Sequence, residues 1–209
     1  MLITFNELNH FIKLPLGIIH VGAHEAEELD DYIKLGVNSI IWIEANPKIF
    51  NKLKNMTDKH SGSSVYNFAA YHSDNEIIEL NIANNGQSSS IFELGTHKQE
   101  HPHVHYIEKI QVPTKKVDSL IEELKIDRFQ FDFINIDIQG AELIALQGMQ
   151  KQLQFAKYIY LEVNEKQLYN GCALINELDL FLEKFKFTRK ITKMTQHGWG
   201  DALYTRDSQ

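Results

Sequence analysis

Short apolar runs alternate with amphipathic segments over the first 70 residues of the chain. Residues 17–21 and 38–46 are apolar without polar alternation, which is typical of strands buried on both faces. Between them, residues 25–35 carry apolar side chains at helical spacing, and Pro47 stands where a second helix can begin. Residues 64–71 form a third apolar run. This alternation of strand and helix predicts a parallel sheet with crossover helices.

The middle of the chain departs from this order. Residues 75–83 and 108–117 have strand patterns, and residues 84–108 between them are polar and rich in serine and histidine. Long loops in compact domains commonly act as lids or binding segments. We therefore expect residues 84–108 to form a lid or an acceptor-binding loop.

The second half returns to alternating elements and ends differently. The pattern predicts helices over 117–124, 141–148 and 174–184, and strands over 131–138 and 156–164. Two final strand runs lie on either side of Gly198–Gly200, and a turn this short joins antiparallel neighbours. The predicted fold class is α/β: a Rossmann-like seven-stranded, mostly parallel sheet with an antiparallel C-terminal hairpin and helices on both faces.

Composition narrows the classes of protein to consider. A chain of 209 residues suits one domain, with residues 1–16 as an N-terminal extension. The net charge of −7 argues against nucleic acid as a partner, because phosphate binding needs clustered Lys and Arg. One cysteine, no signal peptide and no membrane-spanning apolar run favour a cytoplasmic location.

Acidic residues stand at the ends of three predicted parallel strands: Glu44, Asp137 and Glu162. Parallel sheets bind ligands beyond the carboxyl ends of their strands, so these acids are candidates for one site. After the first strand, Gly22 lets the backbone approach a ligand, and the next helix offers free N–H groups to an anion. Glu44 lies 22 residues beyond Gly22, a spacing at which an acid can accept both hydroxyls of a ribose.

The turn at residues 18–28, "IIHVGAHEAEE", distinguishes among nucleotide cofactors. It lacks the G-x-G-x-x-G glycines that a pyrophosphate requires, which makes a nicotinamide dehydrogenase the least favoured alternative. A parallel sheet that ends in an antiparallel hairpin is instead typical of methyltransferases that use S-adenosylmethionine (SAM).

Three stretches resemble the FkbM family of SAM-dependent methyltransferases, and the similarity covers about residues 17–205. They are "IIHVGAHEAEE", "NSIIWIEANPKIFNKL" and "VPTKKVDSLIEELKIDRFQFDFINIDIQGAELIALQGM". Five family positions are retained: Gly22, Glu44, Asp137, Gly140 and Glu142. Five differ, because the family usually has Asp, Asn, Gly, Lys and Glu where this chain has His20, His24, Ala26, Asn135 and Gln139.

The resemblance and the strand-end acids together give a set of expected site residues. The expected cofactor-binding residues are His20, Gly22, Ala23, Glu44, Ala70, Asp74 and Asp137. Asp137 is the first candidate for the catalytic base, with His24 second. Loop residues and strand-end side chains are expected to contact the acceptor substrate: Ser89, Ser90, Gln139, Glu142 and Glu162, with Ser88 a further possibility.

Structural roles remain open for several of these residues. Asp137 can cap the helix that follows it, Glu142 can stabilise that helix through its dipole, and Asp74 can belong to a turn. The histidines between 97 and 105 are spaced as zinc ligands can be, but Pro102 interrupts them, so we expect no metal and assign them to an exposed lid.

The sequence thus predicts SAM-dependent O-methylation of a hydroxyl on a small molecule or a sugar. The alternatives are a SAM- or nucleoside-binding protein without turnover and, less favoured, an NAD-dependent oxidoreductase.

Overall fold

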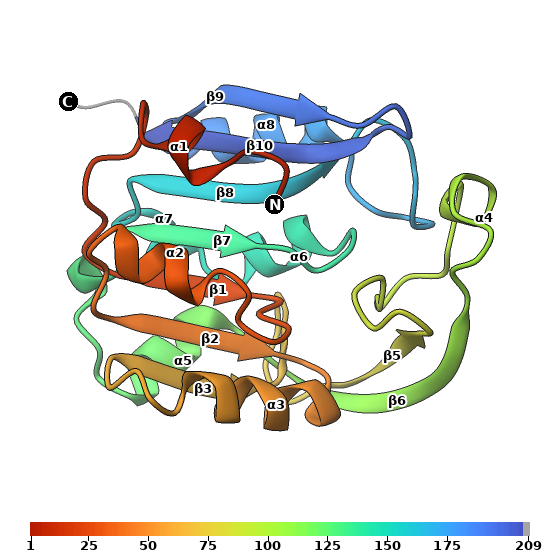
Figure 1. Cartoon of the computed structure of the whole chain (residues 1–209), viewed down its shortest axis with the longest axis horizontal. Helices are drawn as coiled ribbons and strands as arrows, with labels where there is room; N and C mark the ends of the chain where they lie inside the picture. The colour runs from red at the N-terminus through yellow and green to blue at the C-terminus, as the bar shows by residue number, and fades with distance from the viewer. Residues whose placement is uncertain (207–209) are drawn as a thin grey trace.

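The computed structural model describes residues 1–206 and is built on a seven-stranded sheet in the order β3-β2-β1-β7-β8-β10-β9 (Figure 1). In that order the strands are Ser63–Asn67, Ile40–Glu44, Ile18–Val21, Phe133–Ile136, Tyr158–Asn164, Trp199–Arg206 and Phe187–Met194. In this sheet β10 runs antiparallel to both of its neighbours, β8 and β9, and the remaining pairs are parallel. The predicted α/β class, mostly parallel sheet and C-terminal hairpin are therefore confirmed.

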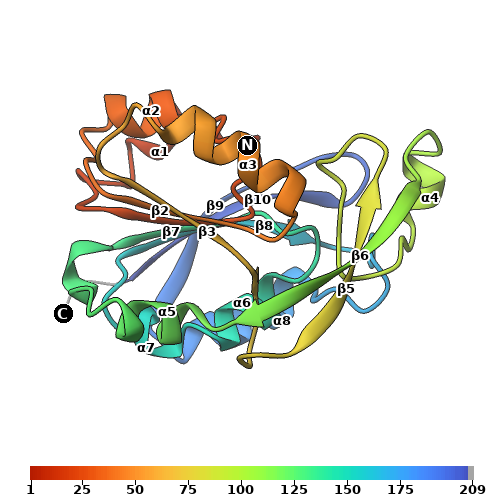
Figure 2. The same cartoon turned by 90° about the horizontal axis from the view of Figure 1, so that it is seen from below.

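Helices cover both faces of the sheet (Figure 2). One face carries α1 (Phe5–Leu8), α2 (Leu29–Lys34) and α3 (Pro47–Thr57), and the other carries α5 (Val117–Glu123), α6 (Glu142–Gln147), α7 (Gln150–Leu153) and α8 (Ile175–Glu183). A 3₁₀ turn, η1 (Arg128–Gln130), precedes β7. Successive strand residues point to opposite faces, so the sheet buries one apolar cluster on each side.

The helix after β1 begins later than its apolar spacing predicts. The expected helix spans 25–35, whereas α2 begins at Leu29. His24 and Ala26 adopt left-handed backbone conformations, with φ of 42° and 62°, which the right-handed α-helix excludes. The chain therefore stays in a loop through residue 28, at the carboxyl end of β1.

The apolar run 64–71 is not one strand, which corrects the prediction. β3 ends at Asn67, and the next residues form β4 (Ala69–Ala70) in a separate three-stranded sheet ordered β4-β6-β5. The Asn67 side-chain amide donates to the carbonyl oxygens of Glu44 at 2.7 Å and Ala45 at 3.1 Å. This side chain ties the end of β3 to the end of β2 where the chain leaves the main sheet.

The small sheet carries the 84–108 segment beyond the carboxyl ends of the central strands (Figure 1). Its longer strands are β5 (Ile77–Ala83) and β6 (Tyr106–Lys115), and α4 (His97–Glu100) lies between them. Two isolated bridges, Asn81↔Ser90 and Leu94↔Tyr169, attach this segment, hereafter the lid, to β5 and to the chain after β8.

The N-terminal segment packs against the sheet. Ile3, Leu8 and Ile12 are buried in the cluster that contains Trp42, and the Leu16 amide donates to the Asp132 carboxylate at 2.8 Å. Within residues 1–206, none of the helices is both long enough and apolar enough to pass through a bilayer.

Candidate active site

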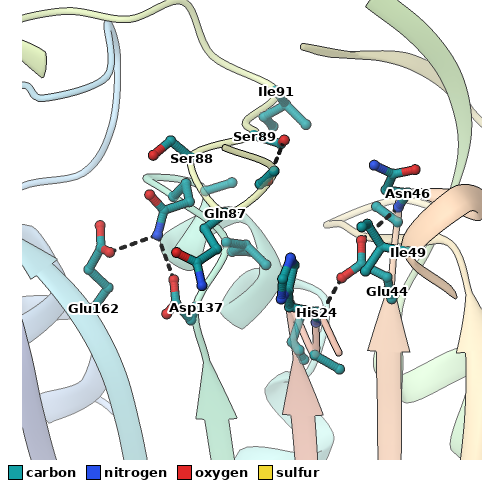
Figure 3. A pocket seen from close by; sticks show the side chains of 18 of the residues that line it. His24, Glu44, Asn46, Ile49, Gln87, Ser88, Ser89, Ile91, Asp137 and Glu162 are labelled. Carbon is teal, nitrogen blue, oxygen red and sulfur yellow. Dashed lines mark hydrogen bonds between the residues drawn. The ribbon is translucent and has the colours of Figure 1, made fainter. Parts of the chain in front are cut away.

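A cavity of about 470 Å³ lies at the carboxyl ends of β1, β2, β7 and β8, beneath the lid (Figure 3). This volume lies in the usual range for small-molecule sites, and the position is the one at which open α/β sheets bind ligands. Ten of the expected residues line it: His20, Gly22, Ala23, His24, Glu44, Ala70, Ser89, Asp137, Gln139 and Glu162.

Gly22 is required by the packing of the protein itself. Its φ is 81°, and a Cβ atom added to it would lie 1.8 Å from the carbonyl oxygen of Asp137. The Gly22 and Ala23 amides donate to the Ile43 carbonyl oxygen at 2.9 and 3.1 Å. The turn after β1 is thus held against the ends of both neighbouring strands, and only glycine allows this approach.

Glu44 is held by backbone amides from two loops. One carboxylate oxygen accepts from the His24 amide at 3.0 Å and the other from the Asn46 amide at 2.7 Å. Desolvation by the surrounding protein raises the pKa of Glu44, and these hydrogen bonds oppose that rise. A carboxylate has about four acceptor sites, so Glu44 can also accept hydrogen bonds from a ligand.

Asp137 and Glu162 are linked by the side chain of Gln139. The Gln139 amide nitrogen donates to Asp137 at 2.6 Å and to Glu162 at 2.8 Å (Figure 3). The Tyr169 hydroxyl donates to the Gln139 amide oxygen at 2.6 Å. Asp137 opens into the cavity, yet the surrounding protein desolvates it and raises its pKa to about 6. Burial and the Asp137 charge also raise the pKa of Glu162.

Three expected residues are not among those that line the cavity: Asp74, Glu142 and Ser90. Asp74 accepts from the Lys116 amide and from the Ser119 hydroxyl, both at 2.7 Å, and so secures the start of α5. Glu142 accepts from the Ile138 and Gly140 amides at 3.2 and 3.0 Å.

The third of these residues, Ser90, donates its hydroxyl to the Gln139 carbonyl oxygen at 2.7 Å. All three side chains are therefore engaged by the protein's own loops. For Asp74 and Glu142 the structural alternatives suggested by the sequence describe their positions better than cofactor or substrate binding does.

Lid residues approach the cavity from above. Ser88 and Ser89 line it, and the Ser89 hydroxyl donates to the Gly86 carbonyl oxygen at 2.6 Å. Gln87, which sequence reasoning missed, extends from the lid toward Asp137 and His24 (Figure 3). The His24 imidazole pairs with Glu27 at 2.6 Å rather than with Asp137.

The histidine-rich part of the lid is only partly exposed. His97 is 6% exposed and packs against Tyr169, whereas His103 and His105 are exposed as expected. Within residues 1–206, no three His, Cys, Asp or Glu side chains are arranged to hold a metal ion. His97, His101 and His103 instead line the cavity, as does Trp199, which sequence reasoning also missed.

The family of the chain follows from a comparison with known protein families. The family model described as the methyltransferase FkbM domain matches residues 20–189. The chain belongs to the FkbM methyltransferase family. This membership supports SAM as the cofactor, as the sequence predicts.

Curated and solved proteins add detail to the family assignment. The 2-O-methyltransferase NoeI of Sinorhizobium fredii (strain NBRC 101917 / NGR234) is 31% identical over 116 residues, which are 56% of this chain and 46% of NoeI. The matched segment thus spans less than half of that relative. TrmK of M. capricolum, solved with S-adenosylhomocysteine, covers 97% of this chain and 67% of its own at 10% identity and a TM-score of 0.52.

A protein of the NADB-Rossmann superfamily from Streptococcus agalactiae gives a TM-score of 0.55 at 12% identity, covering 98% of this chain and 68% of its own. A SAM-dependent methyltransferase from Aquifex aeolicus gives 0.50 at 12% identity, covering 96% and 87%. At these identities the structural likenesses show the fold alone.

Two of the departures from the FkbM pattern are neighbours in space. His20 and Asn135 are register partners on β1 and β7. The Asn135 amide donates to the Tyr32 hydroxyl at 2.6 Å, and that hydroxyl lies 3.1 Å from His20 Nδ1. Burial lowers the pKa of His20 to about 3, so an uncharged chain of three side chains replaces the family's Asp and Lys.

Two further departures from the FkbM pattern lie in the strained loop after β1. The FkbM pattern has Asn and Gly where this chain has His24 and Ala26, and Asn and Gly tolerate positive φ better than other residues. This member keeps the left-handed conformations at both positions without those residues. At the remaining departure, Gln139 is an uncharged donor between two carboxylates, where a glutamate would add a third negative charge.

Proposed function

We propose that this chain transfers the methyl group of SAM to a hydroxyl of a small molecule or a sugar. The observation that carries the proposal is a cavity with the Glu44 carboxylate at one side and the Asp137 carboxylate, whose pKa is raised, at the other. Gly22, Ala23, Glu44 and Asn46 form the cofactor end, and Asp137 with the residues toward β8 and the lid forms the acceptor end. The 2-O-methyltransferase activity named for NoeI supports oxygen as the atom methylated.

The cofactor end has the features that SAM requires. The turn at Gly22 is closely packed, Glu44 retains acceptor sites for the ribose, and Ile49, Phe68 and Ala70 provide apolar surface for the adenine. SAM would supply an electrophilic methyl group on a positively charged sulfur. The residues of this chain would hold the acceptor hydroxyl in line with that methyl group, which is a major source of rate acceleration.

Asp137 is the proposed general base. An alcohol is a weak nucleophile at neutral pH, and a base that accepts its proton as the new bond forms accelerates transfer. A pKa of about 6 leaves Asp137 ionised at neutral pH and more basic than an ordinary aspartate. His24 remains the second candidate, because its Nδ1 pairs with Glu27 and its Nε2 is left as the other ring nitrogen.

Calorimetric titration with SAM and S-adenosylhomocysteine tests the cofactor. Wild type should bind both, and Glu44→Ala should bind each at least about tenfold more weakly because the ribose loses its carboxylate. Glu76→Ala, in the turn before β5 and outside the cavity, is the control. Folded wild-type protein that binds neither ligand would refute the proposal, and binding without methyl transfer to any hydroxyl would favour a non-catalytic SAM-binding protein.

A further inference from the structure

The methionine part of the cofactor needs hydrogen-bond donors for its carboxylate. A carboxylate that leaves water is costly unless donors meet it, and hydrogen bonds to it are strong. The sequence predicts that the helix after β1 supplies such donors through its first N–H groups. In the structure α2 begins at Leu29, and none of its described residues, Leu29–Lys34, lines the cavity. The carboxylate therefore requires donors from elsewhere.

The backbone amides of the turn after β1 are already used within the protein. The amides of residues 22–24 donate to the end of β2. The Glu25 amide donates to the Glu27 carboxylate at 3.2 Å, and the Ala26 amide donates to the Ala23 carbonyl oxygen at 2.9 Å. Among the described residues, no lysine or arginine side chain lines the cavity. Neither these amides nor a basic side chain is therefore available to the carboxylate.

A chain of buried hydrogen bonds leads from β7 to His20. The Asn135 amide nitrogen, which can only donate, lies 2.6 Å from the Tyr32 hydroxyl, and this hydroxyl lies 3.1 Å from His20 Nδ1. The reverse orientation of the Asn135 amide would leave two buried N–H groups unpaired instead of one oxygen. Burial raises the pKa of Tyr32 well above its ordinary value, so the hydroxyl keeps its proton. Because its oxygen accepts from Asn135, its single hydrogen is donated to His20 Nδ1.

The direction of these bonds fixes where His20 carries its proton. A neutral imidazole that accepts a hydrogen bond at Nδ1 has its hydrogen on Nε2. Burial lowers the pKa of His20 to about 3, so the ring is neutral at physiological pH. The ring lines the cavity, and Nε2 has no hydrogen-bond partner within residues 1–206. Nε2 is not one of the described polar atoms that are both enclosed and unpartnered, so it presents an N–H group to the cavity.

Glu28 stands beside this donor. Its carboxylate lines the cavity and lies 4.0 Å from His20 Nδ1. A donor and a carboxylate at one place match the two groups of an amino acid, because the ligand's carboxylate can accept from His20 while its amino group pairs with Glu28. The FkbM pattern has Asp in place of His20, and an ionised Asp can accept from an amino group but cannot donate to a carboxylate.

The Met1 amino group is the alternative partner for a carboxylate. Met1 also lines the cavity, and its positive charge adds to the effect of burial in lowering the pKa of His20. This charge favours a carboxylate in the same place but does not determine which group donates to it. A test must therefore separate His20 from Met1.

We propose that His20 is held as its Nε2–H tautomer and donates this hydrogen to the carboxylate of the methionine part of SAM. Tyr32 and Asn135 are positioning residues, because they set the tautomer and neither of them lines the cavity. This arrangement reverses the polarity that the FkbM pattern has at position 20. The inference rests on SAM as the cofactor and does not depend on the acceptor or on turnover.

Long-range proton–nitrogen NMR correlation of the histidine side chains in the unliganded protein reads the tautomer directly. His20, assigned by the signal that disappears in His20→Asn, should carry its proton on Nε2 and have an unprotonated Nδ1. Tyr32→Phe removes the donor to Nδ1, so the two tautomers should become mixed. A His20 that is protonated on Nδ1 in wild type would overturn the inference before any ligand is added.

Calorimetry with SAM and with decarboxylated SAM, which lacks only the carboxylate, tests recognition of that group. Wild type should bind SAM at least about tenfold more tightly. His20→Asn keeps an acceptor for Tyr32 but is too short to replace Nε2, so it should narrow this ratio at least about threefold. His20→Gln places an amide N–H near the position of Nε2 and should restore most of the ratio. His60→Asn is the control, because His60 is outside the cavity lining and its Nδ1 also pairs with a hydroxyl, that of Ser63 at 3.0 Å.

Two further results would overturn the inference while leaving SAM as the cofactor. One is equal affinity of wild type for SAM and decarboxylated SAM. The other is an unchanged ratio in a folded His20→Asn variant, which would assign the carboxylate to the Met1 amino group or to another donor. If His20→Asn does not fold, Tyr32→Phe takes its place, and an unchanged ratio there would contradict the inference in the same way. Wild-type protein that binds neither SAM nor S-adenosylhomocysteine would refute the cofactor itself.

Discussion

Backbone amides hold the carboxylate at the cofactor end of the cavity, whereas side chains from distant parts of the chain hold the carboxylates at the acceptor end. Glu44 accepts from the His24 amide, in the loop after β1, and from the Asn46 amide, in the loop after β2. Asp137 and Glu162 are positioned by Gln139, which is itself held by Tyr169. Backbone amides are present whatever the side chains, so the first arrangement tolerates sequence change that the second does not.

The largest expected effect of a substitution is on methyl transfer, and it lies at the acceptor end. Asp137→Asn removes the proposed base but retains its size, so methyl transfer should fall by about 10²- to 10⁴-fold. The affinity for SAM, measured by calorimetry, should change much less, because the cofactor end is intact. In wild type, transfer should rise with pH through about 6 as Asp137 ionises. A variant that retains wild-type turnover would exclude Asp137 as the base.

Gly22→Ala tests the backbone-built cofactor end. Its added Cβ would overlap the Asp137 carbonyl oxygen, so we expect the free energy of unfolding in urea to fall by about 2–4 kcal/mol, with loss of SAM binding. Gly36→Ala is a matched control, because Gly36 has φ of 79° but a Cβ atom added to it would meet no other atom within 4 Å. The control should lose about 1 kcal/mol from backbone conformation alone. Equal losses would show that the close approach to Asp137 is unimportant.

Glu142 shapes the loop between Asp137 and α6, because it accepts from the Ile138 and Gly140 amides. Burial raises its pKa to about 7, so the folded protein holds this proton more tightly than the unfolded chain does. Its stabilising contribution is complete below about pH 4.5 and is lost as pH rises through about 7. Glu142→Gln, which keeps the acceptor oxygen, should match wild type near pH 4.5 and gain stability relative to it by about 1–3 kcal/mol at pH 8.

Urea unfolding at several pH values measures the difference between these two proteins, with the exposed Glu183→Gln as the control. A constant difference between wild type and Glu142→Gln from pH 4.5 to 8 would contradict the assignment.

The smallest effect is expected in the strained loop of the cofactor end. Ala26 has φ of 62°, a conformation that costs less for glycine. Ala26→Gly should therefore raise the free energy of unfolding by about 0.5 kcal/mol without changing SAM affinity. Ala145→Gly, within α6, should instead lower it by about 1 kcal/mol. Similar destabilisation in both variants would mean that the loop is not strained at Ala26.

The difference between the cofactor end and the acceptor end also explains which site residues could be predicted from the sequence. Strand-end residues such as Glu44 and Asp137 were found because parallel strands bring their carboxyl ends to one edge, and hydrophobic period identifies those strands. The fold class and the C-terminal hairpin followed from the same signal. That Gln139 bridges Asp137 and Glu162 depends on pairing between β7 and β8, which local pattern does not encode.

Other site residues that sequence analysis missed also owe their positions to contacts between distant segments. Tyr32 has a helical position that gives no sign of its hydroxyl reaching His20 and Asn135. Trp199 and Asp201 reach the cavity because β10 inserts beside β8, and Gln87 reaches it because the small sheet holds the lid. The place of Asp74 just past the third strand suggested a contact with adenine, whereas its carboxylate accepts hydrogen bonds at the start of α5.

After β3 the chain leaves the main sheet and enters β4 of the small sheet. We expect this crossing to link cofactor binding to the order of the lid. Ala69 and Ala70 line the cavity and also pair with Thr114 and Lys115 of β6. A cofactor that restrains these alanines must also restrain the strand pair from which the lid extends. We expect positive cooperativity between the two ligands, because residues that the cofactor has ordered cost less to order when the acceptor binds. The small sheet would thus favour binding of the methyl donor before the acceptor.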